Sequence, residues 1–80
     1  MKPYVFSRHA RNRLRRVKLT QEELLELVPQ AAATRRESTR ENIWIRWQGG
    51  WMRVVLVEEP DTMVVVTVIW PARGPKGQQL

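Results

Sequence analysis

The chain of 80 residues contains no cysteine and only one histidine, His9. A disulfide framework and a thiolate metal site are therefore excluded, and a single histidine cannot form a histidine cluster. The longest apolar run, Met63 to Trp70, is far shorter than the roughly 20 residues that span a bilayer. The amino terminus also has charge where a signal peptide needs an apolar stretch. We expect a cytoplasmic protein with no metal, no cofactor and no membrane partner.

Acidic residues are also few, with 8 Asp+Glu against 14 Lys+Arg and a net charge of +6. On so small a surface this excess attracts polyanions such as nucleic acid. The first eighteen residues contain no acidic residue. They hold half of the basic residues, namely Lys2, Arg8, Arg11, Arg13, Arg15, Arg16 and Lys18. This end of the chain is predicted to seek anions, although a solvated helix face that keeps the protein soluble would have the same composition.

Two helices are predicted in the first part of the chain. A short β-prone run, residues 4–6, precedes Ser7, which is a good N-cap for a helix over residues 8–18. Ala10, Leu14 and Val17 form the apolar stripe of that helix. Thr20 and Glu23 form a capping box that starts a second helix, which Pro29 should end or bend. Residues 30–41 are small and polar, and we interpret them as a connecting segment.

From Asn42 onward the apolar period changes to two, as in strands. Residues 42–48 and 51–58 alternate on either side of Gly49-Gly50, which is typical of a two-residue hairpin turn. That turn would pair Trp47 with Met52, Ile45 with Val54 and Ile43 with Leu56, so one face is uniformly apolar and receives the helices. We expect Trp47 to lie in the core.

The same register would place Arg46 directly opposite Arg53 on the other face, beside Trp44 and Trp51. Like charges facing each other across strands are unfavourable, so a compensating group is needed. Both side chains could extend into water or pair with Glu41 or Glu58. Alternatively, they form a phosphate or carboxylate clamp beside aromatic surfaces on which bases stack.

A turn at residues 59–62 precedes a third long strand, residues 63–70, whose nearly continuous apolar character predicts a place inside the sheet. Residues 4–6 are the spare candidate to cover its outer edge. Thr67 is its polar residue, and the pattern leaves open which face Thr67 occupies. We therefore predict one α+β domain over residues 1–70, with two N-terminal helices on one face of a three- to four-stranded antiparallel sheet. Residues 71–80 are predicted to form a flexible basic tail.

The order of short motifs resembles a known family. Ser7-Arg8-His9-Ala10, Arg13-Leu14, Arg16, Thr20 with Glu22-Glu23, a hairpin and then residues 66–70 are similar to domain of unknown function 4258, a small bacterial and phage family. That family is generally grouped with the RelE-like and BrnT-like toxins, whose fold class includes metal-independent ribonucleases. The resemblance covers residues 4–70 and implies helices on one side of a small sheet in the order β-α-α-β-β-β.

The resemblance also implies site residues. His9 matches the family histidine after the first strand, Arg13 and Arg16 match basic positions of the first helix, and Thr67 matches the threonine of the last strand. His9 could act as a general base or acid at neutral pH, with neighbouring arginines stabilising the charge on a phosphate. It could instead only fasten the first turn of the helix to backbone or to a partner chain.

Three hypotheses remain open at this point. The first is an RNA-directed toxin-like protein that cleaves or occupies RNA, with His9, Arg13, Arg16 and Thr67 as catalytic candidates. Its nucleic-acid-binding candidates are Arg8, Arg46, Arg53, Trp44 and Trp51. The second is a non-catalytic binder of nucleic acid or of an acidic protein such as an antitoxin. The third is a homodimer whose tryptophan-rich face is its interface.

Overall fold

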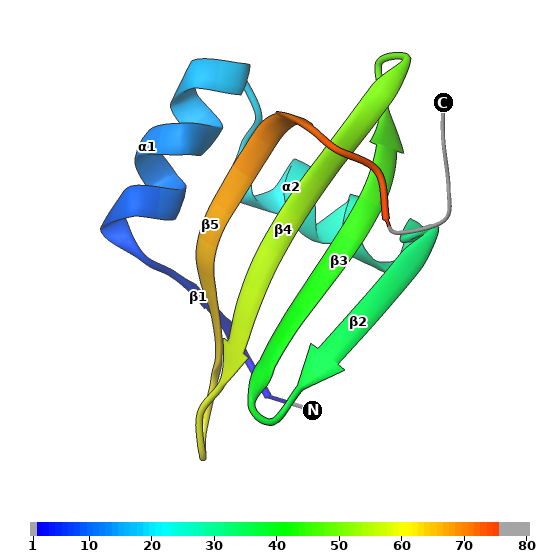
Figure 1. Ribbon diagram of the computed structural model, residues 1–80. Coiled ribbons are helices and arrows are strands. Elements are labelled where there is room, and N and C mark those ends of the chain that lie inside the picture. Colours follow the sequence, from blue (N-terminus) through cyan, green and yellow to red (C-terminus); the bar gives the residue numbers. More distant parts are fainter. Residues whose placement is uncertain (1, 76–80) are drawn as a thin grey trace.

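The computed structural model describes residues 2–75. These residues form two α-helices, a short 3-10 helix and a five-stranded sheet. The elements in chain order are β1 (Tyr4–Phe6), α1 (Arg8–Val17), α2 (Gln21–Leu27), η1 (Val28–Gln30), β2 (Ala33–Glu37), β3 (Arg40–Trp47), β4 (Gly50–Glu58) and β5 (Met63–Ala72). The strand order is β1-β5-β4-β3-β2. In Figure 1, α1 runs beside β5 and α2 crosses behind β4 and β3.

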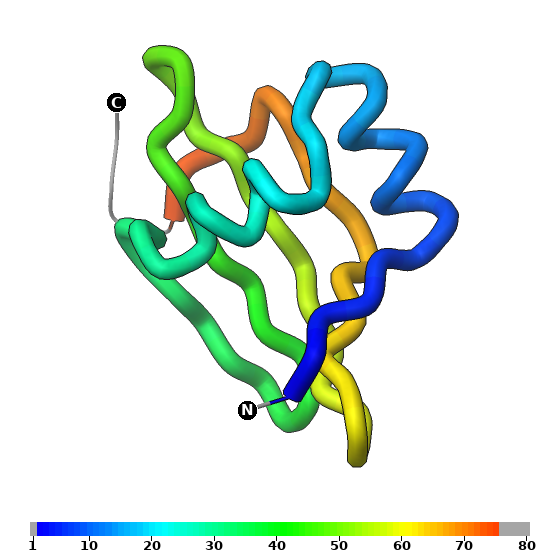
Figure 2. Tube along the Cα trace, turned by 180° about the vertical axis from the view of Figure 1, so that it is seen from behind, coloured from blue at the N-terminus to red at the C-terminus, as the bar shows by residue number. Residues whose placement is uncertain are grey.

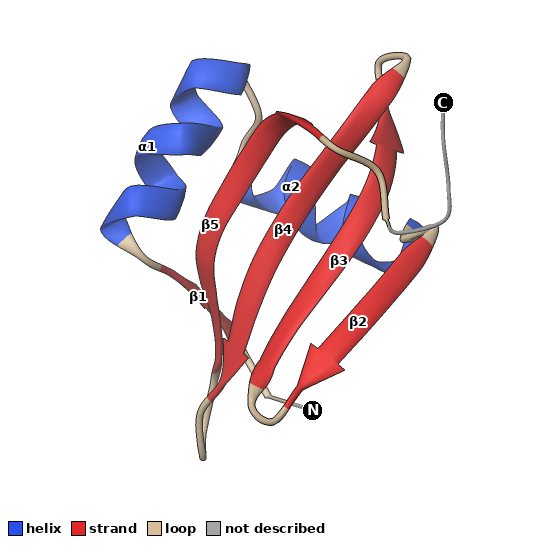
Figure 3. Cartoon of the chain, in the orientation of Figure 1, coloured by secondary structure: helices blue, strands red, loops and turns tan. Residues whose placement is uncertain are grey.

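The predicted α+β class with two helices is confirmed, but the sheet differs from the expected one. It has five strands where three to four were predicted, and it is mixed, because β1 pairs in parallel with β5 while the other pairs are antiparallel (Figure 3). β2 lies within the predicted connecting segment. Four of its five residues are exposed, so it has no alternation of apolar and polar side chains by which a strand is recognised.

Both helices begin where their capping residues predict. The Ser7 hydroxyl accepts a hydrogen bond from the Ala10 backbone N–H at 3.0 Å. Thr20 Oγ1 accepts from the Glu23 N–H at 3.0 Å, and Glu23 Oε1 accepts from the Thr20 N–H at 2.8 Å, which completes the capping box. These bonds satisfy N–H groups that a helix leaves unpaired at its start. α2 ends before Pro29, which lies in the 3-10 turn.

The core lies between the helices and one face of the sheet. It consists of Phe6, Ala10, Leu14, Leu24, Ile43, Ile45, Met52, Val54, Leu56, Val65 and Val68. Seen from behind, α2 covers this face and α1 flanks it (Figure 2). Leu24 is fully buried, and burial of such a side chain contributes about 1.5–3 kcal/mol. None of the helices among the described residues is long and apolar enough to cross a membrane.

β5 lies inside the sheet as predicted, and β1 covers part of its outer edge. Beyond the three residue pairs between β1 and β5, the backbone oxygens of β5 bind groups from α1 and from its N-cap residue Ser7. Ser7 donates from its backbone N–H to Val65 O at 2.9 Å and from Oγ to Val66 O at 2.7 Å, and Arg13 Nε donates to Val68 O at 3.3 Å. The edge carbonyls of β5 are therefore satisfied by groups from outside the sheet.

The end of the domain differs from the expected boundary at residue 70. β5 continues to Ala72, which pairs with Trp51, and residues 73–75 lie against the sheet, where Pro75 is buried. The first two residues of the predicted tail, Pro71 and Ala72, thus belong to β5. The remainder of that predicted tail, residues 76–80, lies outside the described residues.

The turn between β3 and β4 is shifted by one residue from the predicted one. Its two residues are Gln48 and Gly49, with φ of 48° and 76°, rather than Gly49 and Gly50. Positive φ at both positions is the requirement of a type I′ turn, whose twist fits a hairpin. Gly50 lies in β4, and a glycine is needed there for a different reason: a Cβ at this position would lie 2.9 Å from the Trp70 ring. One glycine serves the turn and the other allows a close approach.

The two glycines should respond differently to substitution. Gly50→Ala forces Trp70 to move and should destabilise the fold by about 1–3 kcal/mol, whereas Gly49→Ala meets no atom within 4 Å and should cost about 1–2 kcal/mol through backbone strain. Urea denaturation measures both. In a Trp70→Leu background the cost of Gly50→Ala should shrink and that of Gly49→Ala should not; equal changes would contradict the steric explanation.

Candidate nucleic-acid interface

The face of the sheet opposite the helices, here called the open face, presents alternating arginines and tryptophans. In the observed register Arg46 pairs with Trp51, and Trp44 pairs with Arg53. All four side chains fall on the open face, because Ile43, Ile45, Met52 and Val54 alternate with them and pack in the core. The predicted division into an apolar and an arginine-bearing face is thus correct, although the predicted cross-strand partners were wrong.

In the observed register Arg46 and Arg53 do not face each other, so the predicted like-charge pair is absent. Because the turn is Gln48–Gly49, Arg46 and Arg53 lie on a diagonal, and each faces an indole ring instead of the other guanidinium. The Arg46 Cζ lies 5.2 Å from the Trp51 ring centroid, and the Arg53 Cζ lies 6.0 Å from that of Trp44. Both distances are in the range of cation–π attraction. Neither arginine pairs with Glu41 or Glu58; Glu58 binds Lys2 and Arg36 instead.

Arg46 and Arg53 differ in their remaining contacts. Arg46 is exposed, whereas Arg53 is half-buried and donates from Nε to Asn42 Oδ1 at 2.9 Å. That bond fixes the Arg53 guanidinium and leaves its two terminal nitrogens to other acceptors. A guanidinium held over an aromatic ring has its N–H groups directed outward along its plane, which is the geometry that binds a phosphate or carboxylate in bidentate fashion.

The tryptophan rings themselves are largely covered. Trp44 is 9% exposed and Trp51 is 2% exposed. Residues 71–75 cross this face (Figure 1), and Trp44 Nε1 donates to the backbone oxygen of Arg73 at 3.2 Å. In this arrangement neither ring presents the open stacking surface expected from the sequence. The same burial leaves little tryptophan surface exposed on this face, and the homodimer stays a prediction.

More positive charge lies on this face than the sequence indicated. Strand alternation and pairing put Arg35 and Arg40 on the open face, and the exposed Arg73 follows Ala72. Glu37 is the acidic residue of β2 on this side and lies 3.1 Å from Arg35. Arg35 was missed as a site residue because β2 was not recognised as a strand. Without a predicted strand at β2, no sequence pattern indicated that residues 35 and 40 share a face with residues 46 and 53.

The predicted catalytic residues fall into two places. His9, Arg13 and Arg16 are on α1 at spacings of four and seven residues, which puts them on one side of the helix. His9 and Arg16 are exposed, and Arg13 is held by its bond to Val68 O. Arg13, Arg16, Val17, Val68 and Trp70 line a hollow of about 260 Å³. Arg8, predicted to bind nucleic acid, is also exposed on this helix.

Thr67 is separate from that group. It pairs with Val55, which follows Arg53 by two residues, so Thr67 lies on the open face. The sequence left open which face Thr67 occupies, and in the structure it shares the open face with Arg46 and Arg53. Among the described residues no hydrogen bond or ion pair joins Thr67 to His9, Arg13 or Arg16, and none involves the His9 side chain.

Tryptophans 47 and 70 occupy the helix-covered side. Trp47 packs against the core as predicted, and its ring meets that of Trp70 edge-on, with centroids 4.9 Å apart at an angle of 77°. Trp70 is therefore not part of the open face. In the part of the chain that the structure describes, no group of three or more His, Asp or Glu side chains could hold a metal ion.

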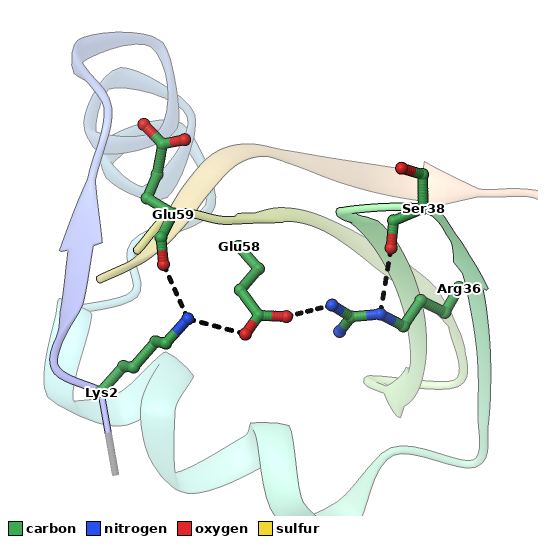
Figure 4. A network of polar contacts seen from close by, with 5 residues as sticks. All are labelled: Lys2, Arg36, Ser38, Glu58 and Glu59. Atoms are coloured by element: carbon green, nitrogen blue, oxygen red, sulfur yellow. Dashed lines mark hydrogen bonds and ion pairs between the residues drawn. The ribbon is translucent and has the colours of Figure 1, made fainter. Parts of the chain in front are cut away.

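A second polar cluster joins three strands at the far end of the sheet (Figure 4). Glu58 accepts from Lys2 Nζ at 2.7 Å and from a terminal nitrogen of Arg36. Lys2 also donates to Glu59 O at 2.7 Å, and Arg36 Nε donates to Ser38 O at 3.1 Å. The bonds from Lys2 and Arg36 lower the pKa of Glu58 below its ordinary value of 4.5. Glu58, at the end of β4, therefore joins Lys2, two residues before β1, to Arg36 of β2.

Acid should weaken this fastening. A carboxyl whose pKa is lower in the folded than in the unfolded chain stabilises the fold above pH 4.5, and the gain is lost as the pH falls through the folded-state value. We expect the melting temperature of Glu58→Gln to fall less steeply than that of the parent protein as the pH is lowered below 4.5. Glu59→Gln is the matched control and should follow the parent curve. A parallel decline in all three proteins would contradict the role given to Glu58.

Comparison of the chain with family models, with curated proteins and with solved structures finds no match.

Proposed function

We propose that this chain is an RNA-directed, toxin-like protein that binds single-stranded RNA through the open face. The observation that carries this proposal is the pair of guanidiniums of Arg46 and Arg53, each set over an indole ring and neither paired with a carboxylate among the described residues. Burial or strong pairing of an arginine signals a structural role. These two are instead oriented by neutral partners and retain N–H groups for an anionic ligand.

The charge around this pair supports a polyanion as the ligand. Arg35, Arg40 and Arg73 lie on the same side, where Glu37 pairs with Arg35, and Glu41 and Glu58 fall on the helix-covered side by strand alternation. The diagonal positions of Arg46 and Arg53 correspond to Cα atoms about 7–8 Å apart, so one extended strand could contact both. Single-stranded RNA offers closely spaced phosphates together with bases that can stack.

The toxin-like character rests on the order of the elements. A strand and two helices precede an antiparallel meander, which has four strands where the resemblance implies three. The RelE-like arrangement is part of the proposal, as is a partner such as an antitoxin. An acidic protein would bind the same arginines, so the alternative of a non-catalytic basic binding module for nucleic acid or protein is tested by the same variants.

Cleavage is the enzymatic form of the proposal, and His9 is the residue that favours it. His9 is exposed and shares one side of α1 with Arg13 and Arg16. An imidazole there could take the proton of a ribose 2′-hydroxyl while a guanidinium stabilises charge on the phosphate. The 2′-oxygen would then bond to the adjacent phosphorus, and the bond from phosphorus to the 5′-oxygen would break, with that oxygen taking a proton from solvent. Such a reaction would be independent of metal.

Removal of both open-face guanidiniums should weaken RNA binding. We expect Arg46→Ala/Arg53→Ala to raise the Kd for a single-stranded oligoribonucleotide roughly tenfold at physiological salt. The slope of log K against log salt should become shallower by about 1.4, because two phosphate contacts are lost. Fluorescence anisotropy across a salt series measures both quantities.

Arg11→Ala/Arg15→Ala is the matched control, since it removes two exposed positive charges from α1 and leaves the open face intact. It should change the slope less. Equal losses in the two double variants would show that net charge alone drives binding. Undetectable RNA binding by the parent protein, together with capture of an acidic protein through Arg46 and Arg53, would select the alternative partner.

A cleavage assay decides the enzymatic form. If His9 is catalytic, the protein should cut single-stranded RNA in the presence of a chelator, and His9→Ala should lower the rate by about 10²–10⁴-fold without changing RNA affinity. Asn12→Ala, on the same helix and also exposed, serves as the control. Unchanged cleavage in His9→Ala would exclude His9 as a catalytic residue. If RNA stays intact at every protein concentration, the enzymatic form fails and only the proposal of a binding protein remains.

A further inference from the structure

The part of the open face best suited to stack a base is covered by the chain's own C-terminal segment. After Ala72 pairs with Trp51, residues 73–75, here called the strap, cross the open face in front of the sheet (Figure 1). The Arg73 oxygen accepts from Trp44 Nε1, Gly74 lies against the Trp51 ring and Pro75 is buried. The strap thus contacts both rings that face Arg46 and Arg53.

The contact with Trp51 is sterically close and chemically incomplete. A Cβ on Gly74 would lie 2.6 Å from Trp51 Nε1 and 2.9 Å from its Cδ1, so the backbone can lie there only because position 74 has no side chain. Trp51 Nε1 is buried and has no hydrogen-bond partner among the described residues. Buried N–H donors are nearly always satisfied, so a donor without a partner calls for an explanation.

The strap has few hydrogen bonds, and its other contacts are the packing of Gly74 against Trp51 and the burial of Pro75. Its register with β4 ends at Ala72, and among the described residues one side-chain hydrogen bond, from Trp44 to Arg73, fastens it. Segments with few backbone hydrogen bonds open at low free energy compared with the rest of a fold. The sheet beneath does not depend on it, since β3 and β4 are paired along their whole length.

We propose that the strap is a displaceable cover, and that single-stranded RNA replaces it on the open face. An acceptor atom of the RNA then bonds to Trp51 Nε1 in the plane of that ring, neighbouring bases stack on the uncovered aromatic faces, and Arg46 and Arg53 hold the flanking phosphates. This inference rests on the proposed function and adds to it a closed state with reduced affinity. The covered rings are available for stacking only in the fraction of molecules whose strap is open, and the apparent Kd rises accordingly.

Substitutions in the strap that change no charge test the inference. Gly74→Ala collides with the Trp51 ring, and Pro75→Ser removes a buried contact, so both should favour the open state. If about a tenth of the parent molecules are open, either variant should bind a single-stranded oligoribonucleotide up to about tenfold more tightly. Pro60→Ser, at an exposed proline in the turn before β5, is the matched control and should bind like the parent.

Indole resonances give a second readout that does not depend on affinity. Addition of oligoribonucleotide to the parent protein should shift the indole N–H signals of Trp44 and Trp51 in a ¹H–¹⁵N spectrum. Trp47 and Trp70, which pack together on the other side of the sheet, are internal controls and should shift little. The signal of Trp51 should move most, because its N–H gains its first hydrogen bond.

The outcomes separate the two proposals. Tighter binding by Gly74→Ala and Pro75→Ser, with shifts confined to Trp44 and Trp51, supports a displaceable strap. Unchanged or weaker binding by these variants, when circular dichroism shows them folded, overturns the strap and leaves RNA binding in place. If neither the parent nor any variant binds RNA, the proposed function fails first, and the strap inference falls with it.

Discussion

The register of β3 against β4 is the constraint on which the remaining features depend. A two-residue turn with positive φ at Gln48 and Gly49 determines which side chains meet across the hairpin. Because the side-chain period of a strand is two, a register that differs by two residues from the predicted one leaves each side chain on its predicted face but gives it a different cross-strand partner. The observed register has two arginine–tryptophan pairs where the predicted register had an unfavourable pair of arginines.

The same register sorts the four tryptophans into two pairs with different surroundings. Trp47 and Trp70 meet on the helix-covered side, where Gly50 leaves room for the Trp70 ring. Trp44 and Trp51 lie on the open face, where arginines and the strap share their surfaces. The sheet is therefore aromatic on both sides, with a dry apolar cluster behind and a positively charged layer in front.

Local signals in the sequence predicted the parts of the fold that local chemistry decides. Ser7 and the Thr20–Glu23 box start their helices as expected, and alternation from Asn42 onward separates the two faces of the hairpin. The turn was placed one residue late because two consecutive glycines are a stronger turn signal than Gln-Gly. The need for Gly50 comes from Trp70, twenty residues further along the chain, and no local pattern can express it.

For the same reason the candidate site was predicted only in outline. Arg46 and Arg53 share a face, as alternation requires, but the cover over Trp44 and Trp51 comes from a segment whose composition resembles a tail. β2 was missed because an exposed polar edge strand is stabilised mainly by its backbone pairing with β3. Arg35 became part of the open face through that pairing, which its own side chain does not reveal.

The way α1 satisfies the carbonyl groups of β5 has a consequence for assembly. Ser7 and Arg13 occupy backbone acceptors of β5 beyond β1, and the opposite border, β2, is lined by Arg35, Arg36 and Glu37. Sheet borders that are blocked or charged resist the addition of a further strand. Addition of a strand is therefore hindered at β2 and beside α1, which leaves β1, three residues long, as the remaining border strand.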